Sequence, residues 1–268
     1  MAVTNENTCN ATGFGIRRAY TYRRDYSLVW RDLMRRWKRR QLTAAMGVAA
    51  ALVAGWTALD GGDHAISVAA PPAPAVTSAS VAELLGTVQV VDQLPEVPGY
   101  QRSCKKGKGC VFGPAWNDPS DHSGCDTRQR ILRTQLVDVT FKPNTRDCKV
   151  LGGLLHDPYT GTDIRYSSAD PTAVEIDHIA ALARVWDLGA WAWTAQQRQA
   201  FANDTDNLLA VSGPANVAKS DAGLQEWLPS NQAYVCAYIE KYLRVVAKYN
   251  LPITRSDRDV AAHSCTTG

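Results

Sequence analysis

An uncharged apolar run, residues 42–59, constrains this chain more than any other feature, because five basic residues stand directly before it. A basic flank followed by such a run is typical of a secretory signal or a single membrane anchor. The run is 18 residues long and rich in Ala, and it contains Gly47 and Gly55. Such a composition is only weakly hydrophobic, which favours a cleaved signal over a retained membrane anchor. We therefore expect a secreted or extracellular protein, anchored to a membrane only if residues 42–59 are retained.

Residues 1–41 form a basic segment before this run. Translation from Met34 would give the compact signal start Met-Arg-Arg-Trp-Lys-Arg-Arg. We interpret residues 1–33 either as a mis-assigned gene start or as a cytoplasmic tail. A buried core helix is a poorer interpretation of residues 42–59, because the basic flank would have no purpose there.

Composition excludes some classes of protein and leaves others open. The 268 residues are 45% apolar and 21% charged, which is ordinary for a globular protein and excludes a wholly disordered or multi-span membrane chain. Residues 1–70 hold ten Lys and Arg against five Asp and Glu, whereas the remainder holds nineteen against twenty-one. The basic excess therefore does not indicate nucleic-acid binding. Five prolines between residues 60 and 98 predict a linker there, which could contain a short helix at Val81–Leu85, followed by one compact domain over residues 99–268.

Six of the seven cysteines follow the apolar run, and an even number on the exported side predicts disulfides. Six cysteines allow 15 pairings, and short spacing favours one of them. The favoured pairs are Cys104–Cys110, Cys125–Cys148 and Cys236–Cys265. A zinc site is the alternative, but the chain contains no Cys-x-x-Cys pair.

Local patterns predict the elements of this domain. Apolar spacing predicts a helix over residues 127–139 and a core-packed helix over residues 234–249, whose tyrosine stripe we assign to the core. A hairpin is expected where residues 150–155 and 164–166 flank a turn at Asp157–Gly161. Strands are expected over residues 174–179 and 208–211. Thr194 and Gln197 form a capping box for a helix over residues 194–202.

Residues able to hydrolyse a phosphodiester gather around the two last strands. If Asp177 and His178 lie at a strand end, the carboxylate can hold a hard cation while the neutral imidazole accepts a proton from water. The amide oxygen of Asn216 is a second ligand of the kind that Mg²⁺ takes. Lys219, one helical turn further, could meet a phosphate.

Structural interpretations stand beside each of these assignments. Asp177 and His178 could be a hydrogen-bonded pair, Asn207 a turn residue and Asn216 a helix cap. Glu175 could support the site or lie on the surface. Asp126 and Arg128 could be a helix cap and an ion pair, or could contact substrate. The basic stretch of Arg102, Lys105, Lys106 and Lys108 could bind phosphates or be a solvated loop.

The order strand, Asp-His, strand, Asn, helix and Asn-x-x-Lys resembles the ββα-metal core of HNH endonucleases. Over about residues 100–265 the chain resembles secreted bacterial members of that family in particular. Five phrases carry the resemblance, namely Cys125-Asp126-Thr127-Arg128, Asp157-Pro158-Tyr159-Thr160-Gly161, Asp177-His178-Ile179, Arg198 with Phe201-Ala202-Asn203-Asp204, and Glu226-Trp227-Leu228-Pro229.

The resemblance implies an α+β fold, in which additional helices pack on a disulfide-stapled ββα-metal core. It implies that His178 is the general base, that Asp177 and Asn216 bind the metal and that Asn207 braces the loop holding the base. Lys219 would stabilise phosphate. Apart from the resemblance, Arg128 is a candidate for contact with substrate. The family often has His where Asn216 stands, so Mg²⁺ or Mn²⁺ is expected rather than Zn²⁺. The residues between His178 and Asn207 are an insertion packed on the core.

The expected function is that of a secreted, monomeric, metal-dependent endonuclease cleaving DNA rather than RNA. Its contact with a membrane would be confined to the N-terminal segment. One alternative is a catalytically silent extracellular binding domain on the same scaffold. Another is an export-linked toxin or nutritional nuclease, which shares the chemistry and has an inhibitor in the cytoplasm.

Overall fold

Three small sheets, rather than one large one, organise residues 78–265, the part of the chain that the computed structural model describes. The strands are β1 (Val90–Val91), β2 (Val137–Phe141), β3 (Val150–His156), β4 (Asp163–Ser167), β5 (Val174–His178), β6 (Leu208–Ser212) and β7 (Ile253–Thr254). The α-helices are α2 (Ser78–Thr87), α3 (Thr127–Gln135), α4 (Leu182–Leu188), α5 (Ala195–Ala202), α6 (Gly213–Lys219), α7 (Val235–Lys248) and α8 (Arg255–Ser264). Single 3-10 turns are Ala190–Ala192, Thr205–Asn207 and Gln232–Tyr234. The predicted α+β class is confirmed.

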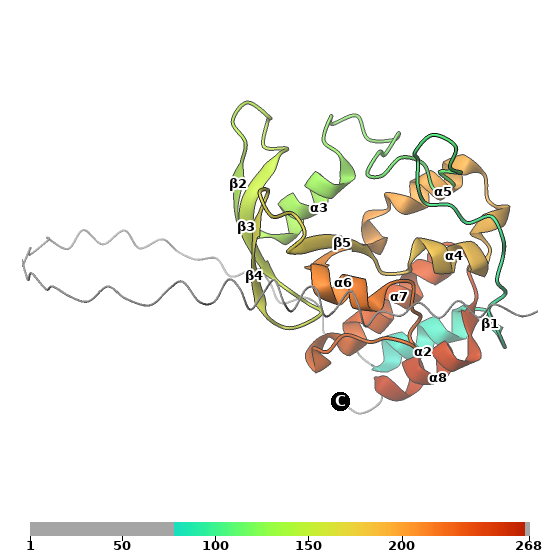
Figure 1. Cartoon of the computed structure of the whole chain (residues 1–268). Coiled ribbons are helices and arrows are strands. Elements are labelled where there is room, and N and C mark those ends of the chain that lie inside the picture. The colour runs from blue at the N-terminus through green and yellow to red at the C-terminus, as the bar shows by residue number, and fades with distance from the viewer. Residues whose placement is uncertain (1–77, 266–268) are drawn as a thin grey trace, which may run out of the picture. The chain divides into compact units, whose positions relative to one another are not determined.

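The β2–β3–β4 sheet is antiparallel, and Figure 1 shows it at one side of the described part. Strands β3 and β4 form the hairpin predicted around the Asp157–Gly161 turn. The helix expected over residues 127–139 instead ends at Gln135, and Val137 begins β2. The apolar residues counted as one helical stripe therefore belong to two elements. Pairing with β3 extends the backbone beyond Leu136 and suits the β-branched residues there.

Helices α2, α7 and α8 group at the other side (Figure 1) around the larger hydrophobic core. Tyr238 and Tyr242 of α7 are fully buried, so the predicted assignment of the tyrosine stripe to the core is confirmed. The capping box of Thr194 and Gln197 begins α5 as predicted. The segment between β5 and β6 packs on this core through Val185 and other side chains of α4 and α5, as expected for the insertion.

The expected linker over residues 60–98 is folded structure in its described part. Val81 of α2 is 2% exposed and belongs to the same core as α7. Val90 pairs with Ile253 in a parallel two-stranded sheet. The helix suggested at Val81–Leu85 is present as part of α2. Residues 78–98 belong to the domain and not to a linker, because α2 buries apolar side chains against the core. Residues 1–77, including the apolar run, lie outside the described residues.

Three disulfides join Cys104 to Cys110, Cys125 to Cys148 and Cys236 to Cys265, as spacing predicted. Between residues 78 and 265, no helix is long and apolar enough to cross a membrane.

Strands β5 and β6 and helix α6 position the candidate site. The two strands are antiparallel, with His178 opposite Leu208 and Asp177 opposite Leu209. Helix α6 begins directly where β6 ends, because the Ser212 side chain caps the helix and Pro214 favours a helix start in the first turn. The end of β5 is thereby brought beside α6.

Candidate active site

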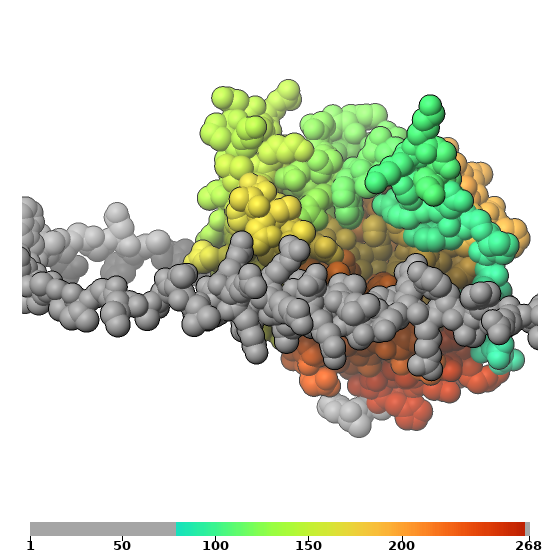
Figure 2. All heavy atoms as spheres, in the orientation of Figure 1, coloured from blue at the N-terminus to red at the C-terminus, as the bar shows by residue number. Residues whose placement is uncertain are grey.

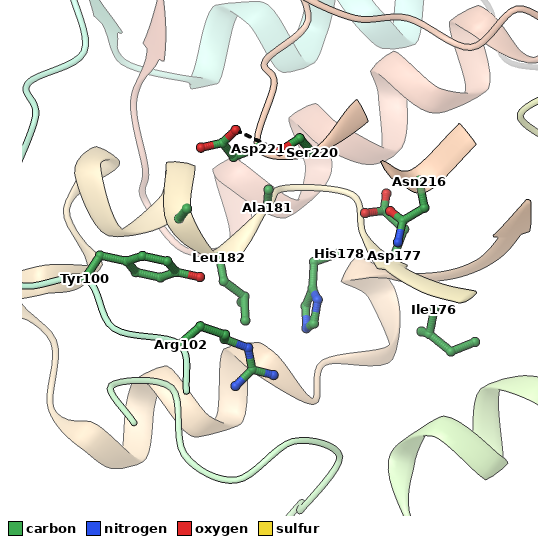
Figure 3. Close-up of a pocket in the computed structure, with 11 residues that line it drawn as sticks. Tyr100, Arg102, Ile176, Asp177, His178, Ala181, Leu182, Asn216, Ser220 and Asp221 are labelled. Carbon is green, nitrogen blue, oxygen red and sulfur yellow. Dashed lines mark hydrogen bonds between the residues drawn. The ribbon is translucent and has the colours of Figure 1, made fainter. Parts of the chain in front are cut away.

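A cavity of about 340 Å³ opens where the end of β5 faces α4 and α6. His178, Asp177 and Asn216 all line it, so the structure brings these three predicted site residues together. Figure 3 shows the His178 ring between the Arg102 guanidinium on one side and Asp177 and Asn216 on the other. The other polar side chains of the lining are Tyr100, Ser220 and Asp221.

The His178 ring is held in one orientation and one tautomer. Its Nε2 lies 2.9 Å from the carbonyl oxygen of Ala202. Since a carbonyl oxygen only accepts, Nε2 carries the proton and Nδ1 keeps its lone pair. Trp116 stacks on the ring, with centroids 5.8 Å apart and planes at 10°. Burial lowers the pKa of His178 to about 4, so the imidazole is neutral at pH 7.

Asn207 holds the backbone that follows His178. Its Oδ1 accepts from the Ala180 N–H at 2.8 Å, and its Nδ2 donates to the Ala180 carbonyl at 3.2 Å. The Asn207 carbonyl also accepts from the Ile179 N–H at 2.9 Å. The side chain is completely buried, so its Oδ1 and Nδ2 atoms bond within the protein and neither atom can reach a substrate.

Asp177 lies at the floor of the cavity, 4% exposed. The Tyr159 hydroxyl donates to its Oδ2 at 2.6 Å, and Lys219 Nζ donates to its Oδ1 at 3.0 Å. Burial raises the pKa of Asp177, while the Lys219 ammonium and the Tyr159 hydrogen bond oppose that rise. The carboxylate is thus held by two donors from elements that are distant in sequence.

The structure corrects the expected role of Lys219. This side chain is fully buried and does not line the cavity. Its ammonium donates to Asp177 and, at 3.0 Å, to the His178 carbonyl. Because the last residue of α6 directs its side chain to the adjoining strand β5, Lys219 neutralises the carboxylate instead of meeting a phosphate.

Arg128 is also placed elsewhere than the expected substrate contact. Its Nη2 donates to the carbonyls of Pro171 and Val174 at 3.0 and 2.9 Å, which fastens α3 to the start of β5. It does not line the cavity. Its neighbour Asp126 caps α3 through Gln129 N, so the structural interpretation of this pair is confirmed for the cap.

Asn216 and Asp177 together offer oxygen ligands that suit a hard cation. Asn216 Nδ2 donates to Glu175 Oε2 at 2.7 Å, so Glu175 orients the amide. The Asn216 Oδ1 takes no hydrogen bond from any described residue. A carboxylate has about four lone-pair positions, and Asp177 uses two of them for Tyr159 and Lys219. Residues 78–265 contain no cluster of three or more His, Cys, Asp or Glu side chains that could hold a metal ion.

Several residues of the site were not assigned to it from sequence. Trp116 stacks on His178, and Tyr159 hydrogen-bonds Asp177. Tyr100 and Asp221 line the cavity. The sequence shows that Arg102 begins a basic stretch. Only the structure shows that Arg102 lines the cavity and that the nearby lysines do not.

Comparison with known proteins gives the chain a family. Residues 126–260 match the family model of GmrSD restriction endonucleases, C-terminal domain. The chain is also 34% identical over 211 residues to an uncharacterized secreted protein of the fungus Arthroderma benhamiae, an alignment that covers 76% of this chain and 95% of the relative. No solved structure matches the chain.

The expected membership of a nuclease family is confirmed at this coarser level. The resemblance pointed to bacterial proteins in particular. This relative is fungal, so similar chains also occur outside bacteria. The matched residues run from the N-cap of α3 into the first part of α8 and include every residue of β5, β6 and α6. With its match over half of its length, the chain belongs to the family of the C-terminal domain of GmrSD restriction endonucleases.

Proposed function

We propose that this chain is a metal-dependent endonuclease of the HNH type that hydrolyses phosphodiester bonds of DNA. In this proposal, β5, β6 and α6 are its ββα-metal core. The observation that carries the proposal is the state of His178: its Nε2–H is engaged by Ala202, and its neutral ring lines a cavity together with Asp177 and Asn216. A neutral imidazole nitrogen held in place beside oxygen donors for a cation can accept a proton from water in phosphodiester hydrolysis with one metal.

The reaction would begin with His178 Nδ1 taking a proton from a water molecule in the cavity. The water oxygen then forms a bond to phosphorus while the bond from phosphorus to the leaving oxygen breaks. The leaving oxygen takes a proton from solvent. Arg102 is the cation of the cavity wall that can hold a phosphate oxygen, and Asn207 keeps the base in place by bracing Ala180.

Asp177 and Asn216 would hold Mg²⁺ or Mn²⁺. Such an ion supplies positive charge that polarises the phosphate and stabilises the leaving oxygen. Both residues line the same cavity and present oxygen atoms, and neither presents the sulfur or imidazole donors that softer metals prefer.

The protein is proposed to be secreted and to act as a monomer. The three disulfides support an oxidising compartment. The name of the fungal relative describes that protein as secreted, which supports the same compartment for this chain. Since the reacting group is the phosphate backbone, little sequence specificity is expected.

Plasmid cleavage by the oxidised full chain tests the proposal. We expect nicking with Mg²⁺ or Mn²⁺, no nicking with EDTA, and at least a hundredfold slower nicking by the His178→Ala variant. His122→Ala is the matched control, since His122 is exposed and does not line the cavity, and it should cleave like the unmodified protein. Circular dichroism verifies that each variant is folded. Folded protein that cleaves nothing with any metal would favour the silent binding domain.

A further inference from the structure

Residues 102–110, which we call the basic loop, carry four cations and no acidic residue. The nearest acidic residue after the loop is Asp118, and none lies between Gly99 and that position. Lys105, Lys106 and Lys108 are exposed, and no acidic side chain among the described residues forms an ion pair with them. In Figure 2 the green segment of this part of the chain projects from the surface. The loop therefore presents concentrated, uncompensated positive charge.

The basic loop is built to keep its shape. The Cys104–Cys110 disulfide closes it. At its base, the Cys110 N–H donates to the Ser103 carbonyl at 3.1 Å, and the Val111 N–H donates to the Gln101 carbonyl at 3.0 Å. The Gln101 side chain also accepts from the Gly109 N–H at 2.7 Å. Charges on a closed loop of this kind lose less conformational entropy on binding than charges on an open chain.

The base of the basic loop is fastened to the element that orients His178. Arg198 of α5 donates from Nε to the Val111 carbonyl at 2.6 Å. The same helix ends at Ala202, whose carbonyl accepts from His178. Arg102, the first residue of the loop, donates from Nη1 to the Gly113 carbonyl at 3.2 Å and lines the cavity with His178 (Figure 3). Positive charge thus continues from the exposed lysines to the cavity wall.

We propose that the basic loop is the arm that binds the phosphate backbone of the nucleic acid and leads it past Arg102 to His178. This inference rests on the proposed function and adds the surface that holds the substrate outside the cavity. A nucleic acid is the occupant that fits, because it carries a row of phosphates at regular spacing. One phosphate would occupy the cavity beside Arg102, and its neighbours along the strand would meet the lysines. A single small anion would leave the three lysines unused.

Salt-dependent binding of a fluorescein-labelled 20-base-pair duplex tests the arm. The protein is the oxidised full chain carrying His178→Ala, so that the duplex stays intact. The loop variant adds Lys105→Gln, Lys106→Gln and Lys108→Gln. Each phosphate contact contributes about −0.9 to the slope of log K against log salt, so removing three should make the slope less negative by about 2 to 3. At low salt, the Kd should rise at least tenfold.

The matched control removes the same charge elsewhere through Lys142→Gln, Lys241→Gln and Arg258→Gln, three exposed cations outside the cavity lining. We expect its slope to stay within 1 of the parent. Equal losses in the two triple variants, or an unchanged slope in the loop variant, would overturn the proposal. So would a loop variant that lost binding to phosphatidylserine vesicles while keeping the parental Kd for DNA. Failure of the proposed nuclease function is seen separately, as absence of cleavage by the unmodified chain.

Discussion

Lys219 Nζ lies 3.0 Å from Asp177 Oδ1, and both side chains are buried, 0% and 5% exposed. The pair joins the end of α6 to the end of β5, and Lys219 also donates to the carbonyl of His178. This ion pair therefore fixes the strand end at which the candidate base and the candidate metal-binding carboxylate leave the backbone. Because Asp177 also lines the cavity, a substitution that breaks this ion pair is expected to change both the candidate site and the stability of the fold.

Replacing Lys219 by Met should lower the free energy of unfolding by about 3–5 kcal/mol, because a buried carboxylate then loses its counter-charge. Urea denaturation followed by circular dichroism measures the change. Lys241→Met is the control at an exposed position of α7 and should change stability by about 0.5 kcal/mol or less. A loss below about 1 kcal/mol for Lys219→Met would contradict a buried ion pair at this place.

Tyr159 and Tyr238 offer a matched comparison of two buried hydroxyls. Tyr159→Phe removes the donor to Asp177 Oδ2 and should cost about 1–3 kcal/mol of stability. The Tyr238 hydroxyl is buried and has no hydrogen-bond partner in the described structure, so Tyr238→Phe should be neutral or slightly stabilising. Denaturation of both variants in one buffer makes the comparison. Equal losses would show that the Tyr159–Asp177 hydrogen bond contributes nothing of its own.

Asn207→Asp should slow cleavage and also destabilise the fold, because Asn207 is completely buried. The variant keeps an acceptor for the Ala180 N–H but places a second acceptor against the Ala180 carbonyl, where Nδ2 now donates. The backbone after His178 would shift, and a displacement of about 1 Å can cost about a hundredfold in rate. Cleavage rates, together with hydrogen exchange at the Ile179 and Ala180 amides, follow both effects. The exposed Asn250→Asp variant should change neither quantity, and parental rates in Asn207→Asp would reject the bracing role.

Stability should fall at alkaline pH because of Tyr242. Burial raises the pKa of this phenol to about 12, whereas the unfolded chain has the ordinary value of about 10. Above pH 10 the unfolded state therefore binds fewer protons than the folded state, and stability is lost as pH rises toward 12. The slope contributed by one such group is about 1.4 kcal/mol per pH unit. Urea denaturation between pH 9 and 12 measures it, and Tyr242→Phe should show a shallower decline.

Local sequence signals predicted much of the fold. The capping box at Thr194, the turn at Asp157 and the strand before His178 depend on neighbours a few residues away, and the structure forms all three. Short spacing also predicted the disulfide partners. The helix expected over residues 127–139 was wrong beyond Gln135, because the strand that pairs with β2 comes later in the chain and local periodicity cannot register it.

The candidate site also has one part that the sequence predicted and one part that depends on contacts between distant residues. The resemblance of the sequence to HNH endonucleases predicted that Asp177, His178, Asn207 and Asn216 belong to one ordered pattern, because their types and order along the chain can be compared without a structure. Only the tertiary structure decided that Lys219 pairs with Asp177 and that Arg128 fastens α3, since these partners lie more than 40 positions away along the chain. It also decided that Arg102 lines the cavity. The direction of a long charged side chain depends on which element packs beside it, and that is a property of the folded core.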